Sequence, residues 1–509
     1  MDRILVLDFG SQYTKLICRR IRELQVYAEI VPFNISPEQV LEQKPKGLIF
    51  SGGPASVTLK PAPRPDFALF NLGLPILGIC YGMQLAAQLL GGRVTPAGAR
   101  EYGQARFHKT KTSPLFFSLP VQFPVWMSHG DSISCLPKGF VKLGRTVQLP
   151  IAAMADEARR IYGVQFHPEV EHTPLGRKIL ANFLFRICRC QPAWTMKNFI
   201  REKTAEIKER VGNEKVLCAV SGGVDSTVMA TLLAQALGRQ LTAVFVDNGL
   251  LRLNEAEDVL RMLKPRLPLL FIPAQQRFLT RLQSVYDPEK KRRIIGREFI
   301  RVFQEVAERA GGIRFLAQGT LYPDLIESRS AFGGPSATIK THHNVGGLPR
   351  NLPFELIEPL KELFKDEVRA LGQALRIPGK ILERHPFPGP GLAVRILGAV
   401  TPQRLSLLRQ ADHIFISELR SAGLYHRVWQ ALAVLLPVRS VGVMGDRRTY
   451  ENVVALRAVT STDAMTADWA RLPQDLLARV ARRITNEVKG INRVVYDISS
   501  KPPATIEWE

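Results

Sequence analysis

The chain has 509 residues, with 69 Lys and Arg against 46 Asp and Glu and a formal net charge of +23. At about 150 residues per domain, this length predicts about three domains. A hydrophobic fraction of 46% and a charged fraction of 23% are typical of packed domains and exclude wholesale disorder. No apolar run reaches the ~20 residues of a spanning helix, and the first residues lack the apolar core of a signal peptide. Six cysteines form no disulfide framework, which predicts a cytoplasmic location.

The positive excess predicts attraction to anions, whether nucleic acid, membrane headgroups or small phosphates. Basic residues are spread along the whole chain, and the densest run, Lys290–Arg293, leads directly into Ile294 and Ile295. A spread excess favours nucleic-acid binding less than a clustered one. Charge alone leaves all three classes of anion open; the motifs described below favour small anions, and with them we expect neither a nucleic acid nor a membrane as partner.

Strand-like and helical stretches alternate over the first ~190 residues, a rhythm that predicts a mostly parallel sheet covered by helices. The expected strands are residues 4–8, 47–50 and 76–79, followed by β-like segments at 121–127 and 161–166. The expected helices are residues 12–24 and 175–188. The dipeptide Gln191-Pro192 makes a plausible boundary after them.

Two further units follow. The second is predicted to be α/β, with helices at 196–211 and 227–237 and strands at 215–220, 242–246 and 314–317. A Pro- and Gly-rich stretch, 385–391, marks its end. The third mixes helices at 403–422 and 473–488 with strands at 438–442, 453–458 and 493–497. The predicted fold class is α/β: two mostly parallel-sheet α/β domains, 1–191 and 192–384, followed by a small α+β dimerisation domain, 385–509.

A cysteine stands at a sharp turn between an expected strand and an expected helix. The segment Gly78-Ile79-Cys80-Tyr81-Gly82 has the Gly-x-nucleophile-x-Gly form of a nucleophile elbow. Cys80 would lie at the helix N-terminus, where the macrodipole and free N–H groups stabilise a thiolate. A buried structural cysteine is the commoner fate of a lone thiol, but the elbow favours catalysis.

A catalytic thiol needs a base from elsewhere in the chain. The segment Phe166-His167-Pro168-Glu169 supplies an imidazole that could take the thiol proton and a carboxylate that could orient it. On sequence alone His129 is a competing base.

These two segments resemble the class I glutamine amidotransferase domain. The resemblance implies that Cys80 attacks the side-chain amide of glutamine, that His167 is the base and that Glu169 completes the triad. It further implies an oxyanion hole from Gly53 and the Tyr81 N–H. The segments that hold glutamine would include Gln84, Ser128 and His129.

A second strand–turn–helix carries a glycine-rich loop, Ser221-Gly222-Gly223-Val224-Asp225-Ser226. Bare N–H groups at a helix start suit phosphate oxygens, and no Lys-Ser/Thr pair follows as in a Walker A loop. The hexamer resembles the loop of the N-type ATP pyrophosphatases. The ATP-binding residues implied are Ser221, Gly222, Gly223, Val224, Asp225, Ser226, Thr227 and Asp247. We expect Mg²⁺ to accompany ATP, with Asp225 as the metal candidate.

Three later segments narrow the choice of the molecule that accepts the nitrogen: Ile339–Asn344, His385–Arg395 and Ser499–Glu509. Together they resemble the glutamine-dependent GMP synthetase family, along the whole chain from Ile4 to Glu509. The resemblance implies that the third domain binds xanthosine monophosphate (XMP) and forms a homodimer. The residues it places around XMP are Arg292, Gln430, Asp446, Lys501 and Glu507.

The implied reaction has two halves. ATP adenylylates the C2 oxygen of XMP with release of pyrophosphate, and ammonia from glutamine then displaces AMP to give GMP. We expect the basic segment Gln275–Arg301 to act as a lid. The alternatives are another glutamine-dependent amidating ligase, such as NAD synthetase, and a basic nucleic-acid-binding protein, whose binding would depend steeply on salt.

Overall fold

The computed structural model describes residues 1–59, 61–328, 354–444, 446–461 and 466–509. The described residues form two compact units: Met1–Phe199, and Ile200–Ser328 together with residues 354–509. The predicted boundary at 191 lies near this division, whereas the predicted boundary at 384 lies inside the second unit. The segment Ile339–Asn344, which the sequence singles out, lies outside the described residues.

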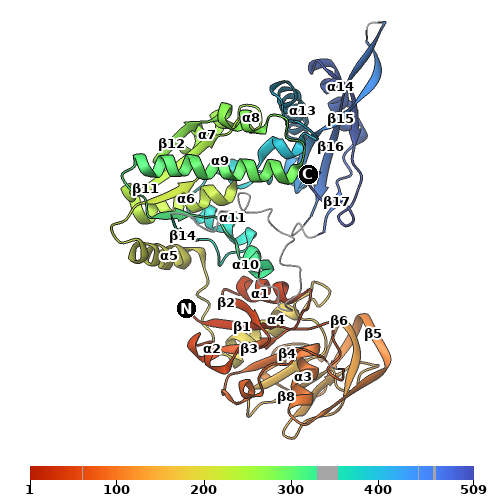
Figure 1. The fold of residues 1–509 in the computed structure, drawn as a ribbon. Coiled ribbons are helices and arrows are strands. Elements are labelled where there is room, and N and C mark those ends of the chain that lie inside the picture. The colour runs from red at the N-terminus through yellow and green to blue at the C-terminus, as the bar shows by residue number, and fades with distance from the viewer. Residues whose placement is uncertain (60, 329–353, 445, 462–465) are drawn as a thin grey trace. The chain divides into compact units, whose positions relative to one another are not determined.

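The first unit contains nine strands and several helices (Figure 1). The strands are β1 (Arg3–Asp8), β2 (Tyr27–Pro32), β3 (Gly47–Phe50), β4 (Ile76–Ile79), β5 (Arg93–Lys109), β6 (Gln122–Cys135), β7 (Val141–Arg145), β8 (Ala153–Asp156) and β9 (Ile161–Val164). The α-helices are α1 (Thr14–Glu23), α2 (Pro37–Glu42), α3 (Tyr81–Leu89) and α4 (Gly176–Asn182), and a π-helical turn, Phe183–Ile187, follows α4.

All nine strands form one sheet, in the order β2-β1-β3-β4-β9-β8-β7-β5-β6. The pairs from β2 to β9 are parallel, and those from β9 to β6 are antiparallel. The parallel strands β3, β4 and β9 are buried along their whole length, as expected for strands covered on both faces. This confirms the predicted parallel sheet, and it brings the ends of β4 and β9, which carry Cys80 and His167, next to each other.

The second unit continues the numbering. Its α-helices are α5 (Met196–Val211), α6 (Val224–Leu237), α7 (Glu255–Leu263), α8 (Gln275–Leu282), α9 (Pro288–Arg309), α10 (Tyr322–Ser328), α11 (Lys365–Ala374), α12 (Gly379–Leu382), α13 (Pro402–Ser421) and α14 (Gln474–Glu487). Its strands are β10 (Val216–Ala219), β11 (Leu241–Asp247), β12 (Leu269–Pro273), β13 (Phe315–Ala317), β14 (Glu355–Ile357), β15 (Gln430–Met444), β16 (Arg447–Thr460), β17 (Asp468–Trp469) and β18 (Ile491–Tyr496).

Two sheets organise this unit (Figure 1). The first is parallel throughout, in the order β12-β11-β10-β13-β14. The second is built on the long antiparallel hairpin β15–β16, with β17 antiparallel and β18 parallel to β16. This confirms the predicted α/β class followed by a smaller α+β part. One apolar cluster runs through residues of both sheets, from Leu217 in β10 to Leu435 in β15.

The segment Gln275–Arg301, expected to be a lid, forms α8 and most of α9. These helices contribute Phe278, Ile295 and Ile300 to the apolar cluster, all of them buried. Most of the basic residues of α9 are exposed while its apolar face is packed, and the lid role stays a prediction.

No helix among the described residues combines the length and apolar character needed to cross a membrane. The six cysteines, all in the described part of the chain, are free thiols.

Candidate active site

The first candidate site is built around Cys80, which links β4 to α3. Cys80 lies in the positive-φ region, with φ 52° and ψ −106°, and only 6% of the residue is exposed. Its N–H donates to the Val164 carbonyl at the end of β9 (2.8 Å). Such backbone strain in a non-glycine residue persists only where the surroundings impose it, and it is common at nucleophiles.

The two glycines that flank Cys80 allow this turn to pack. A Cβ on Gly78 would lie 2.6 Å from the Gly82 backbone, and a Cβ on Gly82 would lie 2.3 Å from the Phe50 carbonyl oxygen of β3. No real Cβ contact is so short, so neither position accepts a side chain without moving the backbone. The elbow spacing seen in the sequence is therefore a packing requirement of this sheet edge.

Cys80, His167 and Glu169 come together at this edge. His167 Nδ1 lies 2.7 Å from Glu169 Oε1, and the Cys80 thiol is close enough to the same imidazole to raise its pKa. Burial of the ring favours its neutral form, but the charge and hydrogen bond of Glu169 and the nearby Cys80 thiol outweigh burial and hold the pKa of His167 well above its ordinary value. An imidazolium is thus stabilised beside the thiol.

Other contacts hold the main chain of His167 and Glu169 and the imidazole ring. The Thr173 hydroxyl donates to the His167 carbonyl (2.7 Å), and the Tyr13 ring meets the imidazole edge-on with centroids 5.2 Å apart. Arg20 donates to the Glu169 carbonyl (3.0 Å). The contacts from Thr173 and Arg20 hold the main chain of the two residues, and the Tyr13 ring packs against the imidazole, which helps to preorient the base.

The residues expected to hold glutamine surround the thiol. The Gln84 amide nitrogen donates to the Asp131 carbonyl (2.9 Å) and to Gln165 Oε1 (3.1 Å). The Ser128 carbonyl faces the Cys80 sulfur at 3.5 Å. Gln84 therefore braces the strand segment that carries Ser128 against the elbow. At the turn after β3, a Cβ on Gly53 would lie 2.8 Å from the Phe9 carbonyl, and the Tyr81 N–H lies in the first turn of α3, where N–H groups have no intrahelical partner.

His129, the competing base, has other partners. Its Nδ1 lies 3.1 Å from the Asp131 carbonyl and its Nε2 lies 3.6 Å from Glu101. Burial lowers the pKa of His129, although the charge of Glu101 opposes this. The imidazole whose pKa the Cys80 thiol raises is instead that of His167.

Sequence reasoning missed Gln165 and Glu101. Gln165 is fully buried, and its amide nitrogen lies 3.5 Å from the Cys80 sulfur. Gln165 follows the end of β9 and reaches the thiol of a residue 85 positions earlier in the chain, so its role had no local sequence signal. Glu101 carried no signal, since its partner His129 is brought to it by pairing of β5 with β6.

The second candidate site is the loop between β10 and α6. Ser226 Oγ accepts from the Ser221 N–H (3.1 Å) and lies 2.9 Å from Ser221 Oγ, while Ser221 Oγ accepts from the Gly223 N–H (3.3 Å). Gly222 has φ 78°, and its carbonyl accepts from Arg384 (2.7 Å). The loop thus opens α6 at Val224 with first-turn N–H groups that have no intrahelical acceptor, an arrangement that suits phosphate oxygens.

Two carboxylates accompany this loop. Asp225, the metal candidate, pairs with Lys365 of α11 (2.6 Å), and Asp247 accepts from the Gln275 amide (2.7 Å) and the Gly249 N–H (2.9 Å). The described residues include no group of three or more His, Cys, Asp or Glu side chains that could hold a metal. Magnesium at nucleotide sites is commonly held by one or two carboxylates and the phosphates themselves, so Asp225 fits an ion that arrives with ATP.

Thr227 and Gln318 also belong to this region. Thr227 Oγ1 and Gln318 Oε1 are buried and have no hydrogen-bond partner among the described residues. Thr227 lies in the first turn of α6, and Gln318 directly follows β13. Unpaired buried polar atoms are costly, so these two mark positions where a bound molecule could supply the missing contact.

The third candidate site lies where residues 505–509 meet the second sheet. Glu507 accepts two hydrogen bonds from Arg395 (2.8 and 3.1 Å) and one from Gln430 (2.6 Å). Burial of Glu507 would raise its pKa, but the charge of Arg395 and these hydrogen bonds lower it. Glu507 is therefore held as a carboxylate.

Arg292 approaches the same segment from α9 and donates to the Glu509 carbonyl (2.6 Å). The neighbouring Lys291, fully buried, donates to Glu509 Oε2 (2.6 Å) and to the carbonyls of Ala393 and Ile396. Lys501 pairs through its backbone with Ala467 on the β17 side. Lys291 therefore anchors residues 505–509. Sequence reasoning had singled out its neighbour Arg292 instead.

Asp446 does not join these residues within one chain. It is exposed, has φ 60° and lies at the turn of the β15–β16 hairpin, whereas Gln430 begins β15. Over the length of β15, at ~3.3 Å per residue, Gln430 lies roughly 45 Å from the strand end that is next to Asp446.

Comparison with known proteins identifies the family of this chain. The class-I glutamine amidotransferase family model matches residues 5–187, and the GMP synthase C-terminal domain model matches residues 417–508. The chain is 59% identical to a glutamine-hydrolysing GMP synthase of Thermomicrobium roseum, covering 100% of this chain and 97% of the relative. It is 57% identical to one of Carboxydothermus hydrogenoformans, covering 100% of both. A solved GMP synthase component of Thermoplasma acidophilum shares 34% identity, with a TM-score of 0.34, over 37% of this chain and 94% of that one. This chain belongs to the glutamine-hydrolysing GMP synthase family.

Proposed function

We propose that this chain is a ligase that uses glutamine and ATP to convert XMP to GMP. The observation that carries the proposal is the meeting of Cys80, His167 and Glu169 at one sheet edge, in a chain that also carries a phosphate-type loop and an anchored Glu507. A role in nucleic-acid binding alone does not explain why the thiol, the imidazole and the carboxylate lie together. If the chain were an NAD synthetase, its full-length similarity to GMP synthases would be unexplained.

In the first half-reaction, the Cys80 sulfur attacks the amide carbon of glutamine as His167 takes the thiol proton. Glu169 stabilises the imidazolium, in keeping with the raised pKa of His167. N–H groups of Gly53 and Tyr81 would receive the oxyanion. His167 then returns the proton to the leaving nitrogen, ammonia departs, and water hydrolyses the thioester to glutamate.

In the second half-reaction, the XMP C2 oxygen attacks the α-phosphorus of ATP and pyrophosphate leaves. The role proposed for residues 221–227 is to hold the phosphates by backbone N–H groups and the hydroxyls of Ser221 and Ser226. Magnesium bound with ATP at Asp225 would supply charge neutralisation at the departing pyrophosphate. In the structure Asp225 pairs with Lys365, and this pairing would have to give way to the ion. Ammonia then attacks C2 and AMP leaves, giving GMP.

For XMP, the proposal assigns the phosphate to the cations Arg292 and Lys501, and the base to Glu507 and Gln430. Because Asp446 lies far from Gln430 along the same chain, it would reach an XMP site only in a second copy. The exposed apolar side chains of the hairpin, Val441, Val443 and Tyr450, favour such a homodimer. Equilibrium sedimentation tests this, and a monomer at micromolar concentration would remove Asp446 from the proposal.

The function is tested by incubating the protein with ATP, Mg²⁺, XMP and glutamine and following GMP. Cys80→Ala should abolish GMP formation from glutamine while leaving formation from ammonium salts near the wild-type rate. Cys135→Ala, which removes an exposed thiol outside the site, is the matched control. No GMP from either nitrogen source with the wild-type protein would refute the assignment.

A further inference from the structure

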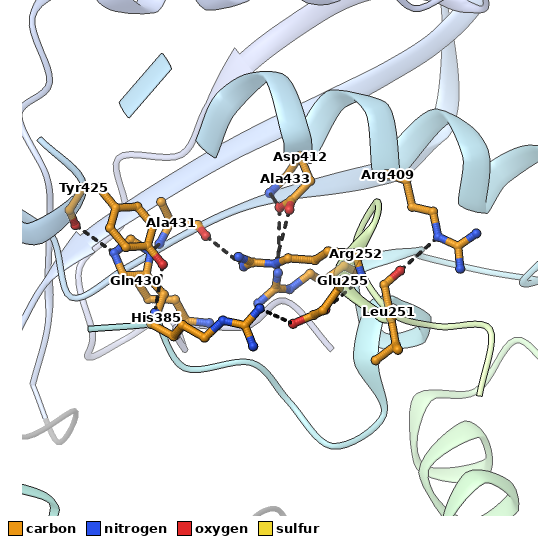
Figure 2. Close-up of polar contacts among 12 residues, drawn as sticks. Leu251, Arg252, Glu255, His385, Arg409, Asp412, Tyr425, Gln430, Ala431 and Ala433 are labelled. Carbon is orange, nitrogen blue, oxygen red and sulfur yellow. Dashed lines mark hydrogen bonds and ion pairs between the residues drawn. The ribbon is translucent and has the colours of Figure 1, made fainter. Parts of the chain in front are cut away.

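Charged side chains connect the phosphate-type loop to the Glu507 segment within the second unit. They come from the loop that follows β11, from the first residue of α7, from residues 384–395 and from α13 (Figure 2). None of them is among the residues assigned above to ATP or XMP. Their alternating charges and short distances form a continuous path between the two proposed nucleotide sites.

One end of this path holds the phosphate-type loop. Arg384 donates to the Gly222 carbonyl (2.7 Å) and lies 3.7 Å from Glu255 Oε1. The other carboxylate oxygen of Glu255 accepts from the Arg252 backbone N–H (3.0 Å). The main chain at Arg252 is thus tied to the loop that would carry ATP phosphates.

The other end holds the Glu507 segment. The Arg252 side chain lies 3.3 Å from Asp412 Oδ2, and Asp412 Oδ1 accepts from the Ala433 N–H (3.2 Å) and lies 3.8 Å from Arg395. Arg395 in turn makes its two hydrogen bonds to Glu507. Figure 2 shows Arg252 reaching Asp412 on α13 while its own backbone stays beside Glu255.

A second arginine holds the same loop from α13. Arg409 donates to the carbonyls of Leu251 (2.9 Å) and Gly249 (2.7 Å). These contacts fix the chain between Asp247 and Arg252 against α13. Arg252 itself is the residue at which the main-chain link to Glu255 and the side-chain link to Asp412 meet.

We propose that Arg252 is a positioning residue that couples ATP binding at the 221–227 loop to XMP binding at Glu507. This inference rests on the proposed function. The Asp412 carboxylate is nearly buried, with 2% of its side chain exposed, and Arg252 is 17% exposed, so the pair is shielded from solvent. A nucleotide that fixes one end of the path lowers the ordering cost at the other end, and each ligand therefore binds more tightly when the other is present.

The test is calorimetric titration of XMP into the full chain, with and without a non-hydrolysable ATP analogue and Mg²⁺. For the wild-type protein we expect the analogue to tighten XMP binding at least fivefold, within the usual range of coupling between sites. For Arg252→Met this factor should fall toward one, while XMP alone binds within about threefold of wild type. The matched control is Arg261→Met, which removes an exposed arginine from α7 and should retain the wild-type factor.

Asp412→Asn keeps the side-chain size and the acceptor for the Ala433 N–H, so it carries the test if Arg252→Met does not fold. It should also lower the factor. A wild-type factor near one, or an unchanged factor in both variants, overturns the inference. Failure of the proposed function would be seen differently, as absence of GMP from the wild-type protein with ammonium salts.

Discussion

His385 makes the stability of the second unit sensitive to acid. Its ring is buried and stacked on Tyr425, with centroids 3.8 Å apart. Nε2 lies 2.8 Å from the Tyr425 carbonyl and must donate a proton to it, while Nδ1 accepts from the Ala431 N–H (3.2 Å). Both nitrogens are used by the neutral ring, and a second proton would remove the acceptor that Ala431 needs.

The size of the effect follows from the pKa. Burial lowers the pKa of His385 from 6.5 to about 4, against the hydrogen bond to the Tyr425 carbonyl and with help from the positive charge of Arg252. At about 1.4 kcal/mol per pH unit, this difference corresponds to about 3 kcal/mol. Between pH 6.5 and 4 the unfolded chain binds the proton and the folded chain does not, so stability is fully present above pH 6.5 and falls as the pH drops through this window. At pH 5 the loss should be about 2 kcal/mol.

The assay is urea unfolding at pH 7.5, 6.5, 5.5 and 5.0, followed by tryptophan fluorescence. Replacing Trp126 and Trp194 by Phe leaves tryptophans only in the second unit, so its transition is observed separately. His385→Gln keeps a donor for Tyr425, lacks the titrating ring, and should be destabilised by about 1–3 kcal/mol at pH 7.5 because the Ala431 N–H loses its acceptor. Between pH 7.5 and 5.0, the free energy of unfolding should fall for both proteins. The fall should be about 2 kcal/mol smaller for His385→Gln than for the otherwise identical protein that retains His385.

The matched control is His413→Gln, which removes an exposed histidine from α13 and should retain the pH dependence of the parent. Equal pH dependence of the parent and His385→Gln would refute the reasoning.

Three further predictions concern the sites. Glu169→Gln should lower kcat for glutamine-dependent GMP synthesis by at least ~10²-fold, because the His167 imidazolium loses its charge partner; unchanged activity with ammonium salts is the control. Gly82→Ala should yield less folded protein or a first unit with a lower Tm, since its Cβ would lie 2.3 Å from the β3 carbonyl, and a wild-type Tm would contradict this. Arg395→Met should destabilise the second unit by about 2–3 kcal/mol, because Glu507 loses a doubly hydrogen-bonded cation, and Arg395→Met with Glu507→Leu should recover part of that loss in urea unfolding.

Much of the parallel architecture was predictable because buried parallel strands are short, continuous apolar runs. The strands at 47–50 and 76–79 and the helix at 196–211 agree with their predicted bounds. The elbow around Cys80 was also predictable, because the flanking glycines are dictated by local close packing.

The less predictable parts depend on contacts between residues far apart in sequence. β5 runs for 17 residues and contains Pro96 and several glycines, which mask a strand whose pairing comes from β6. The packing of the segment Gln275–Arg301 as α8 and α9 could not be predicted from its charges, because a charged outer face does not reveal the packing of the inner face. Gln165 and Lys291 acquire their roles from partners 85 and 218 residues away, which no local pattern indicates.

The ionic path from Arg384 to Glu507 also determines how this part of the molecule responds to heat. The cost of removing charges from water declines as temperature rises, whereas apolar stabilisation per unit area levels off. The contribution of contacts such as Arg395–Glu507 to the free energy of unfolding should therefore increase on warming, relative to that of the surrounding apolar core. At high temperature, the geometry around the proposed XMP position is therefore expected to depend more on these ionic contacts, and less on apolar packing, than at room temperature.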